Sequence, residues 1–240
     1  MGAMAEPLYA TQDINKAIRA QIKKGSTTKI EGLEGQHSIA VGLSMDAKVA
    51  IVGAAGDFFG ALNNGTTLLI TGNAGRYLGD TMKSGKIVVD GDVDSGCGAN
   101  LQGGEIIVKG SAGDRAGAGA KGGSIIINGN AGDKLGMNLF GGDILITGDA
   151  GFDVGSYMLG GTIYVNGKIS SLGKQTRLSR LDSHDKLKLT NYLTEQNISG
   201  EFKFRKVESE KGVPFDIIKN LMGLSPKKQK EDPSEGEEEG

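Results

Sequence analysis

The sequence predicts an all-β fold: a single-stranded, right-handed parallel β-helix in which a 19-residue repeat forms each coil and short helices flank the array. Three observations predict it. Glycine makes up 41 of the 240 residues, but there is no Gly-X-Y period, so collagen is excluded. A short β-branched strand precedes each of seven glycines spaced 19 residues apart. These lead glycines are Gly53, Gly72, Gly91, Gly110, Gly129, Gly148 and Gly167.

Each predicted strand alternates, and the alternation defines its inner face. The residues four and two positions before a lead glycine are apolar throughout, as Ile106 and Val108 are before Gly110. A repeat of 19 residues is too short for a helical crossover, so each strand should pair in parallel with its equivalent one coil later. Glycines in three further columns should form the corners. We expect positive φ and close neighbouring coils there, including at Gly113 and Gly132.

An outward-facing stripe is predicted along the strands. The residue three positions before each lead glycine is apolar in every coil, although its neighbours point inward. At about 4.8 Å per coil the stripe is roughly 34 Å long, and such a surface is normally covered. The terminal helices are short, so we expect the cover to be a second copy of the chain or another subunit. The predicted interface residues are Leu69, Val88, Ile107, Ile126, Leu145 and Tyr164.

The ends of the chain depart from the repeat. In the N-terminal arm, Asp13 is placed to N-cap a helix from Ile14 to Lys24, and residues 27–47 should form an irregular first coil. The predicted segments are therefore an arm with a helix (1–26), the β-helix (27–173), a helix and strand extension (174–224) and a charged, disordered tail (225–240).

The C-terminal extension should contain three elements. We expect a helix over residues 183–197, with Leu189 and Tyr192 on its apolar side. A strand should run from Glu201 to Val207, and a short amphipathic helix from Phe215 to Leu224.

Composition excludes several classes of function. The net charge of −2 gives no field that would attract nucleic acid or an anionic membrane. No apolar run approaches the roughly 18 residues of a membrane span. A single cysteine excludes an internal disulfide, a multi-cysteine zinc site and an iron–sulfur cluster. With no export signal, the chain is expected to be cytoplasmic.

Two motifs have both a catalytic and a structural interpretation. Residues 117–122 match the Gly-x-Gly-x-x-Gly dinucleotide fingerprint, but no helix fits before the strand at Ile125, so we interpret these glycines as corners. Cys97 could be a nucleophile, but it occupies an apolar column with Leu78 and Leu135, which favours a buried side chain.

Polar columns suggest turns rather than a metal centre. An aspartate ladder of Asp57, Asp114 and Asp133 could bind cations, but aspartate is also typical of exposed turns, and we favour that interpretation. His37 and His184 lie at opposite ends of the chain, without metal-ligand spacing. The predicted set of catalytic, cofactor-binding and metal-binding residues is therefore empty.

The repeat Gly-x-x-Gly-x-x-x-Gly, followed by a glycine pair and an Ile-x-Ile strand, resembles the GXGXG domain that ends the large subunit of glutamate synthase. The stand-alone components of N-methylglutamate synthase and of archaeal split glutamate synthases look most similar. A scaffold component of formylmethanofuran dehydrogenase shares the repeat, but the segment around His37 and the Ser-Ser-Leu-Gly exit favour glutamate synthase. The resemblance covers roughly residues 9–214 and extends to the segments Asn15–Ile22, Gln36–Leu43, Ser170–Gly173 and Leu187–Val207.

The resemblance implies a non-catalytic scaffold subunit of a glutamate synthase-type oxidoreductase that makes glutamate or N-methylglutamate. It implies separate glutaminase-type and FMN synthase-type partners, with FMN and an iron–sulfur cluster in the partners and no cofactor in this chain. We expect no activity from the chain alone. Two alternatives stay open: the equivalent scaffold of a formylmethanofuran dehydrogenase-type complex, and a stand-alone hydrolase or ligand-binding β-helix.

Overall fold

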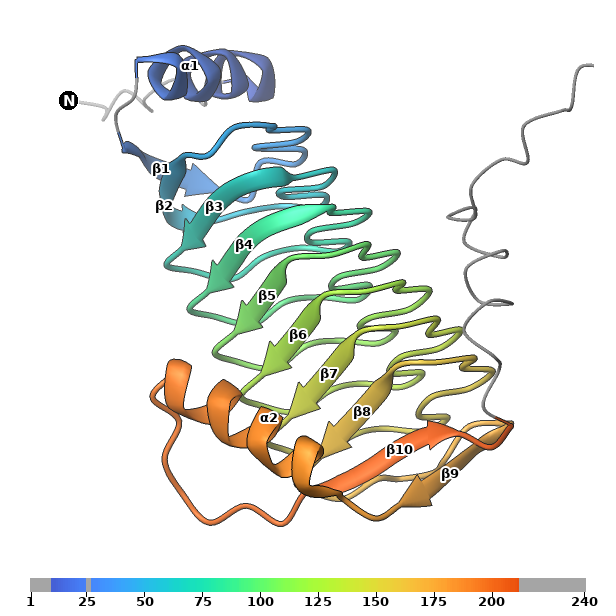
Figure 1. The fold of residues 1–240 in the computed structure, drawn as a ribbon. Coiled ribbons are helices and arrows are strands. Elements are labelled where there is room, and N and C mark those ends of the chain that lie inside the picture. Colours follow the sequence, from blue (N-terminus) through green and yellow to red (C-terminus); the bar gives the residue numbers. More distant parts are fainter. Residues whose placement is uncertain (1–9, 25–26, 212–240) are drawn as a thin grey trace, which may run out of the picture.

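A computed structural model describes residues 10–24 and 27–211 and confirms the predicted solenoid (Figure 1). Ten strands form one sheet in the order β1-β2-β3-β4-β5-β6-β7-β8-β10-β9, with only two short helices among the described residues. The elements are α1 (Thr11–Lys23), β1 (Thr28–Glu34), β2 (Lys48–Ala54), β3 (Asn64–Ile70), β4 (Ser84–Val89), β5 (Glu105–Val108), β6 (Ser124–Ile127), β7 (Asp143–Ile146), β8 (Thr162–Val165), β9 (Thr176–Ser179), α2 (Ser183–Glu195) and β10 (Arg205–Ser209).

Strands β1 to β8 pair in parallel, each with its equivalent in the next coil. Ile106 lies opposite Ile125 and Val108 opposite Ile127, so like residues stack in the core. These inward side chains are almost fully buried, and each contributes on the order of 1.5–3 kcal/mol by leaving water. The predicted core columns are therefore confirmed.

Small residues let the coil close opposite the sheet. A second parallel ladder of single bridges links Ala55, Ala74, Val93, Ala112, Ala131, Ala150 and Ile169. Most of these residues are alanine, which fills little of the interior and leaves space for the Ile and Leu side chains of the strands.

Helix α1 closes the N-terminal end of the core, with Ile14, Ile18 and Ile22 buried. One prediction there was wrong. The helix begins before Asp13, and the N-cap residue is Ala10, which makes no side-chain hydrogen bond. Asp13 instead lies in the first turn, where its charge is favourable to the helix dipole. The first coil is irregular, as expected: residues 28–34 form β1, but β1 has a bulge at Gly32, and Thr28 pairs with Val49, 21 residues later instead of 19.

The C-terminal end departs from parallel stacking. Strand β10 lies between β8 and β9 and is antiparallel to both. It begins at Arg205 rather than at the predicted Glu201, and β9 was not predicted. The predicted helix over 183–197 is confirmed as α2, with a capping box between Asp182 and Asp185. The expected helix Phe215–Leu224 and the charged tail lie outside the described residues.

The lead glycines are required mainly by close packing between coils. Only Gly53 of the seven has a positive φ. A Cβ on Gly72 would lie 2.6 Å from the carbonyl oxygen of Gly53 in the preceding coil. Gly113 and Gly132 also lack the positive φ that we expected. Glycine is required at these positions because a side chain would contact the neighbouring coil. A Cβ on Gly132 would lie 2.7 Å from the backbone nitrogen of Asp114.

Candidate functional site

The outward stripe is largely covered by the chain itself. Helix α2 crosses the outer face of the later strands (Figure 1), and Leu189 on its inner side is buried against them. The partly buried residues Leu181, Tyr192, Ile198 and Phe204 complete the cover. The stripe residues buried beneath it are Ile107, Ile126, Leu145 and Tyr164.

A buried polar network holds the N-terminal end of α2. Asp185 accepts hydrogen bonds from the Tyr164 hydroxyl (2.7 Å) and from Lys206 Nζ (2.9 Å). Burial alone raises the pKa of Asp185, but the hydrogen bonds from Tyr164, from the Asp182 backbone and from Lys206 outweigh it and lower the pKa to about 2. Burial and the bond to Asp185 together raise the pKa of Tyr164 above its ordinary value. The site thus holds an ionised carboxylate against a neutral phenol.

A second polar contact holds α2 one turn further along. Lys188 Nζ lies 2.9 Å from Asp143 of β7, and the Tyr192 hydroxyl lies 3.3 Å from the same carboxylate. Burial and the Asp143 charge raise the pKa of Tyr192 to about 12, so the phenol keeps its proton. Both contacts attach the helix to the sheet.

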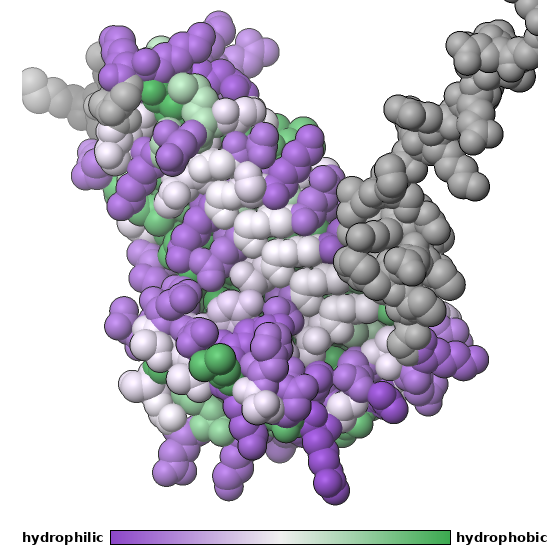
Figure 2. Space-filling view, in the orientation of Figure 1, coloured by the Kyte–Doolittle hydropathy of each residue, from purple (hydrophilic) through white to green (hydrophobic). Residues whose placement is uncertain are grey.

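This arrangement corrects the predicted interface. Ile107, Ile126, Leu145 and Tyr164 face α2 instead of a second molecule, because the helix and the segment after it reach further along the stripe than expected. Val88 packs at the edge of this cluster, Leu69 lies beyond it, and both stay half-buried. On this face the described surface is mostly hydrophilic or neutral, and hydrophobic residues form only small separate spots (Figure 2).

The polar columns are ladders between coils. Asp114 accepts a hydrogen bond from the backbone N–H of Asp133, and Asp133 accepts one from Phe152 (both 2.8 Å). Asp57 accepts one from Arg76 (2.8 Å) and forms an ion pair with its guanidinium, which lowers the pKa of Asp57. At the start of this ladder His37 Nδ1 accepts from the Asp57 N–H (2.8 Å).

A second ladder runs beside the first. Asn73, Asp92, Ser111, Asn130 and Asp149 each accept a hydrogen bond from the backbone N–H one coil later. Within the described residues, no group of three or more His, Cys, Asp and Glu side chains is arranged to hold a metal ion. These polar residues therefore have a stabilising role that requires no bound cation.

The remaining sequence candidates also have structural roles. Burial raises the pKa of the Cys97 thiol to about 12, so the reactive thiolate is strongly disfavoured at neutral pH. The fingerprint at residues 117–122 leads into strand β6 and not into a helix, so the strand–turn–helix context for a dinucleotide is missing. His184 is exposed in the first turn of α2.

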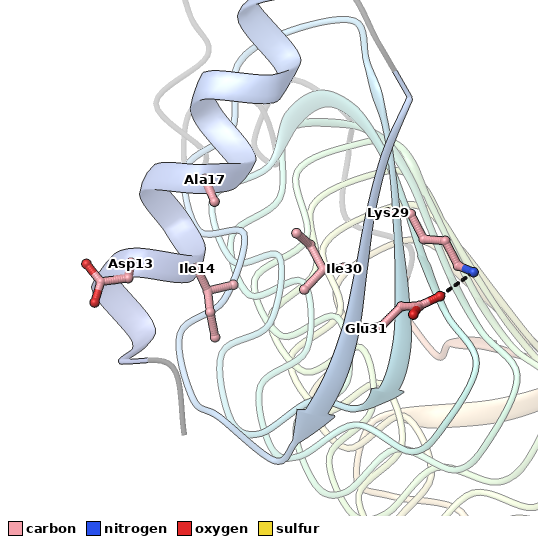
Figure 3. Close-up of a pocket in the computed structure, with 6 residues that line it drawn as sticks. All are labelled: Asp13, Ile14, Ala17, Lys29, Ile30 and Glu31. Carbon is pink, nitrogen blue, oxygen red and sulfur yellow. Dashed lines mark ion pairs between the residues drawn. The ribbon is translucent and has the colours of Figure 1, made fainter. Parts of the chain in front are cut away.

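Among the clefts formed by the described residues, two lie at opposite ends of the solenoid. The first, of about 380 Å³, separates α1 from β1, with Ile14, Ala17 and Ile30 on its apolar side and the Lys29–Glu31 ion pair beside it (Figure 3). The second, of about 290 Å³, is lined by Lys134, Met137, Asp153, Ser156, Tyr157 and Lys174. The second cleft contains the Ser156 hydroxyl, but its oxygen accepts a hydrogen bond from the backbone N–H of Lys174 (3.3 Å), and no basic side chain is hydrogen-bonded to it in the described part of the chain.

The sequence reasoning missed one surface feature. Phe58, Leu62 and Tyr77 are large apolar side chains that stay exposed in the turns of the early coils, and the rings of Phe58 and Tyr77 stack. The signal in the repeat was that large apolar residues occur at these turn positions in adjacent early coils, where later coils mostly have polar residues or glycine, as at Gly96 and Asn100.

Comparison with known proteins adds a family. A family model described as the GXGXG motif matches residues 6–200. No curated protein matches the chain. Within the part of the chain that the structure describes, neither helix has the length and apolar character needed to cross a bilayer.

Proposed function

The chain belongs to the GXGXG motif family, that of the C-terminal domain of glutamate synthase, and on this premise we propose that it is a scaffold subunit of a multi-subunit glutamate synthase-type oxidoreductase. It would hold a glutaminase-type subunit and an FMN synthase-type subunit together, as a stand-alone version of the domain. The complex would make glutamate or N-methylglutamate. The observation that carries the proposal is the family match, which spans α1, the whole solenoid and α2.

The polar groups support a scaffold role. The strongly shifted carboxyl and phenol groups, Asp185, Tyr164 and Tyr192, all serve to dock α2 onto the sheet. The aspartate and asparagine columns are used in ladders between coils. The chemistry of these residues is therefore directed at making a rigid body, which is what a subunit that positions two others requires.

The residues present do not fit an iron–sulfur cluster, because the chain has one cysteine and such a cluster needs several thiolate ligands. That cysteine, Cys97, is also fully buried in the core. We therefore place FMN and the iron–sulfur cluster in the partner subunits.

Co-expression tests the proposal. The tagged chain should co-purify with a glutaminase-type and an FMN synthase-type protein from the same genome. The complex should form glutamate from glutamine and 2-oxoglutarate with a chemical reductant, and the two partners without this chain should couple the reactions poorly. A Gly132→Val chain, whose coils should not pack, serves as the control. Co-purification with a molybdopterin-containing protein instead would point to the formylmethanofuran dehydrogenase-type alternative.

A further inference from the structure

Three bulky apolar residues are exposed at left-handed turn positions of the early coils. Phe58, Leu62 and Tyr77 have φ values of +60°, +58° and +59°, in the left-handed region. They are 41 %, 48 % and 40 % exposed. Elsewhere the same two columns hold glycine or asparagine in some coils and larger residues in others, all with a positive φ. The small residues are Gly96, Asn100, Gly119 and Asn138, and the larger ones are Thr81, Arg115, Lys134 and Tyr157.

The left-handed conformation is shared by large residues in other coils, so what distinguishes these three is their apolar exposure in adjacent coils. A large side chain in the left-handed region is strained, and an exposed apolar side chain gains little from the hydrophobic effect. Asparagine or glycine would relieve both costs, and the chain uses them in neighbouring coils. Strain combined with apolar exposure is typical of a binding surface.

The side chains build a flat platform. The Phe58 and Tyr77 rings stack with centroids 5.2 Å apart and an angle of 9° between their planes. Tyr77 in turn lies over Gly96, where a Cβ would come within 2.7 Å of the ring. The Tyr77 ring therefore packs on the Phe58 ring and also covers the backbone of Gly96.

A carboxylate without a cationic partner lies beside the platform. Asp80 follows Tyr77 in a tight turn closed by a 3.2 Å hydrogen bond between their backbones. Its oxygens accept only from the neutral groups of Thr81 and Asn100. No ion pair to Asp80 is found in the described part of the chain, whereas Asp57 is paired with Arg76.

We propose that Phe58, Leu62, Tyr77 and Asp80 form the docking surface for a partner subunit that presents an arginine or lysine among apolar residues. The cation would pair with Asp80 beside the exposed part of the Tyr77 ring, while apolar residues of the partner would pack against Phe58 and Leu62. The inference rests on the proposed function, because the partner is a subunit of the same complex. It commits to a protein partner, whose charge is complementary to Asp80.

The test combines stability with binding. The variants are Leu62→Asn, the double variant Phe58→Asn with Tyr77→Asn, and Asp80→Asn. Lys134→Asn is the matched control, since Lys134 shares the column of Phe58, has a φ of +59° and lies three repeats beyond Tyr77. Thermal unfolding is measured on each purified chain, and affinity is measured with the co-expressed glutaminase-type and FMN synthase-type subunits.

Binding should fall while the fold is kept. We expect Leu62→Asn to leave the melting temperature unchanged or to raise it by about 2–4 °C, because strain is relieved. The double variant should lose at least about tenfold in affinity for one subunit, and Asp80→Asn about fivefold, with weaker salt dependence. Lys134→Asn should bind like the wild type.

The other outcomes are decisive. If the wild type binds a subunit and the patch variants bind it equally well, the docking surface is wrong while the proposed function stands. If the wild type binds neither subunit, both fail. A drop of more than about 5 °C for Leu62→Asn would show that the fold needs the patch, which also overturns the inference.

Discussion

The hydroxyl of Tyr164 donates a 2.7 Å hydrogen bond to the carboxylate of Asp185, and the two side chains are 0 % and 4 % exposed. Tyr164 is the last residue of the apolar stripe, and Asp185 lies in the first turn of the helix that covers it. The bond therefore joins the repetitive part of the molecule to its non-repetitive cover, and it sets the position of α2 on the sheet.

Removing the Tyr164 hydroxyl should loosen α2. We expect Tyr164→Phe to lower the free energy of unfolding by about 1–3 kcal/mol, because Asp185 loses a buried donor. Hydrogen exchange should rise in residues 183–195 before it rises in the strands. Tyr157→Phe removes a hydroxyl from an exposed ring and should change neither quantity. Equal protection of α2 in Tyr164→Phe and wild type would contradict this role.

Asp185 should contribute to acid unfolding. Its pKa is about 2 in the folded chain against an ordinary value of 3.8, so the unfolded chain binds the proton more readily. The contribution is fully present above the unfolded value and is lost as the pH falls toward 2. Stability should therefore drop less between pH 5 and pH 2 in Asp185→Asn than in the wild type, by about 2 kcal/mol.

A side chain at Gly132 should prevent neighbouring coils from packing. Gly132→Val should destabilise the fold by more than about 2 kcal/mol, because its Cβ would overlap the backbone of Asp114. Gly42→Asn is the control, since Gly42 has a φ of +63° and open space around its Cβ position. Chemical denaturation of both variants distinguishes contact from backbone strain, and wild-type stability of Gly132→Val would refute the packing argument.

A charged side chain on the covered part of the stripe should lower the stability of the fold, whether or not it also affects assembly with a partner. Ile126 is fully buried beneath α2, so Ile126→Glu should cost more than about 3 kcal/mol. The double variant Ile107→Lys with Ile126→Glu should release α2 for the same reason. Leu69→Glu lies beyond the helix and should cost less than about 1 kcal/mol. Limited proteolysis at 183–195 tests the difference, and resistant α2 in Ile126→Glu would show that the cover is mispositioned.

Cys97 should stay unreactive while the chain is folded. Its thiol is fully buried, and burial raises its pKa to about 12, so a thiol-specific disulfide reagent should label it only after unfolding. The labelling rate should follow the denaturant-induced transition. Rapid labelling in native buffer would show that the core opens locally at this coil.

The solenoid could be predicted because each coil repeats the same local rule. Ile106, Ile125 and Ile144 occupy one column, so a single period fixes their inward direction and their partners. The cover could not be predicted in this way. The stripe is outward-facing by alternation, but alternation does not identify what lies against it, and Leu189 contacts it only because the chain turns back.

Strand β10 illustrates the same limit. Its position between β8 and β9 depends on pairing with residues about 30 and 40 positions earlier in the chain, as for Val207 with Leu178 and Ile163. No local pattern specifies such a pairing. Phe58 and Tyr77 were missed for another reason: the turn columns were interpreted through their glycines, and the residues that replaced glycine or asparagine were not weighed.

The coil spacing also means that the length of the solenoid can change only in fixed steps. One repeat of 19 residues advances the chain by one strand separation, about 4.8 Å. Helix α1 closes one end of the solenoid. Near the other end, α2 is held to β7 by the Lys188–Asp143 ion pair and to β8 by the Tyr164–Asp185 hydrogen bond. Coils between β2 and β4 can therefore be gained or lost without changing the contacts of either helix. Insertion or deletion of whole repeats would therefore change the separation between surfaces at the two ends in steps, and would leave the surfaces themselves intact.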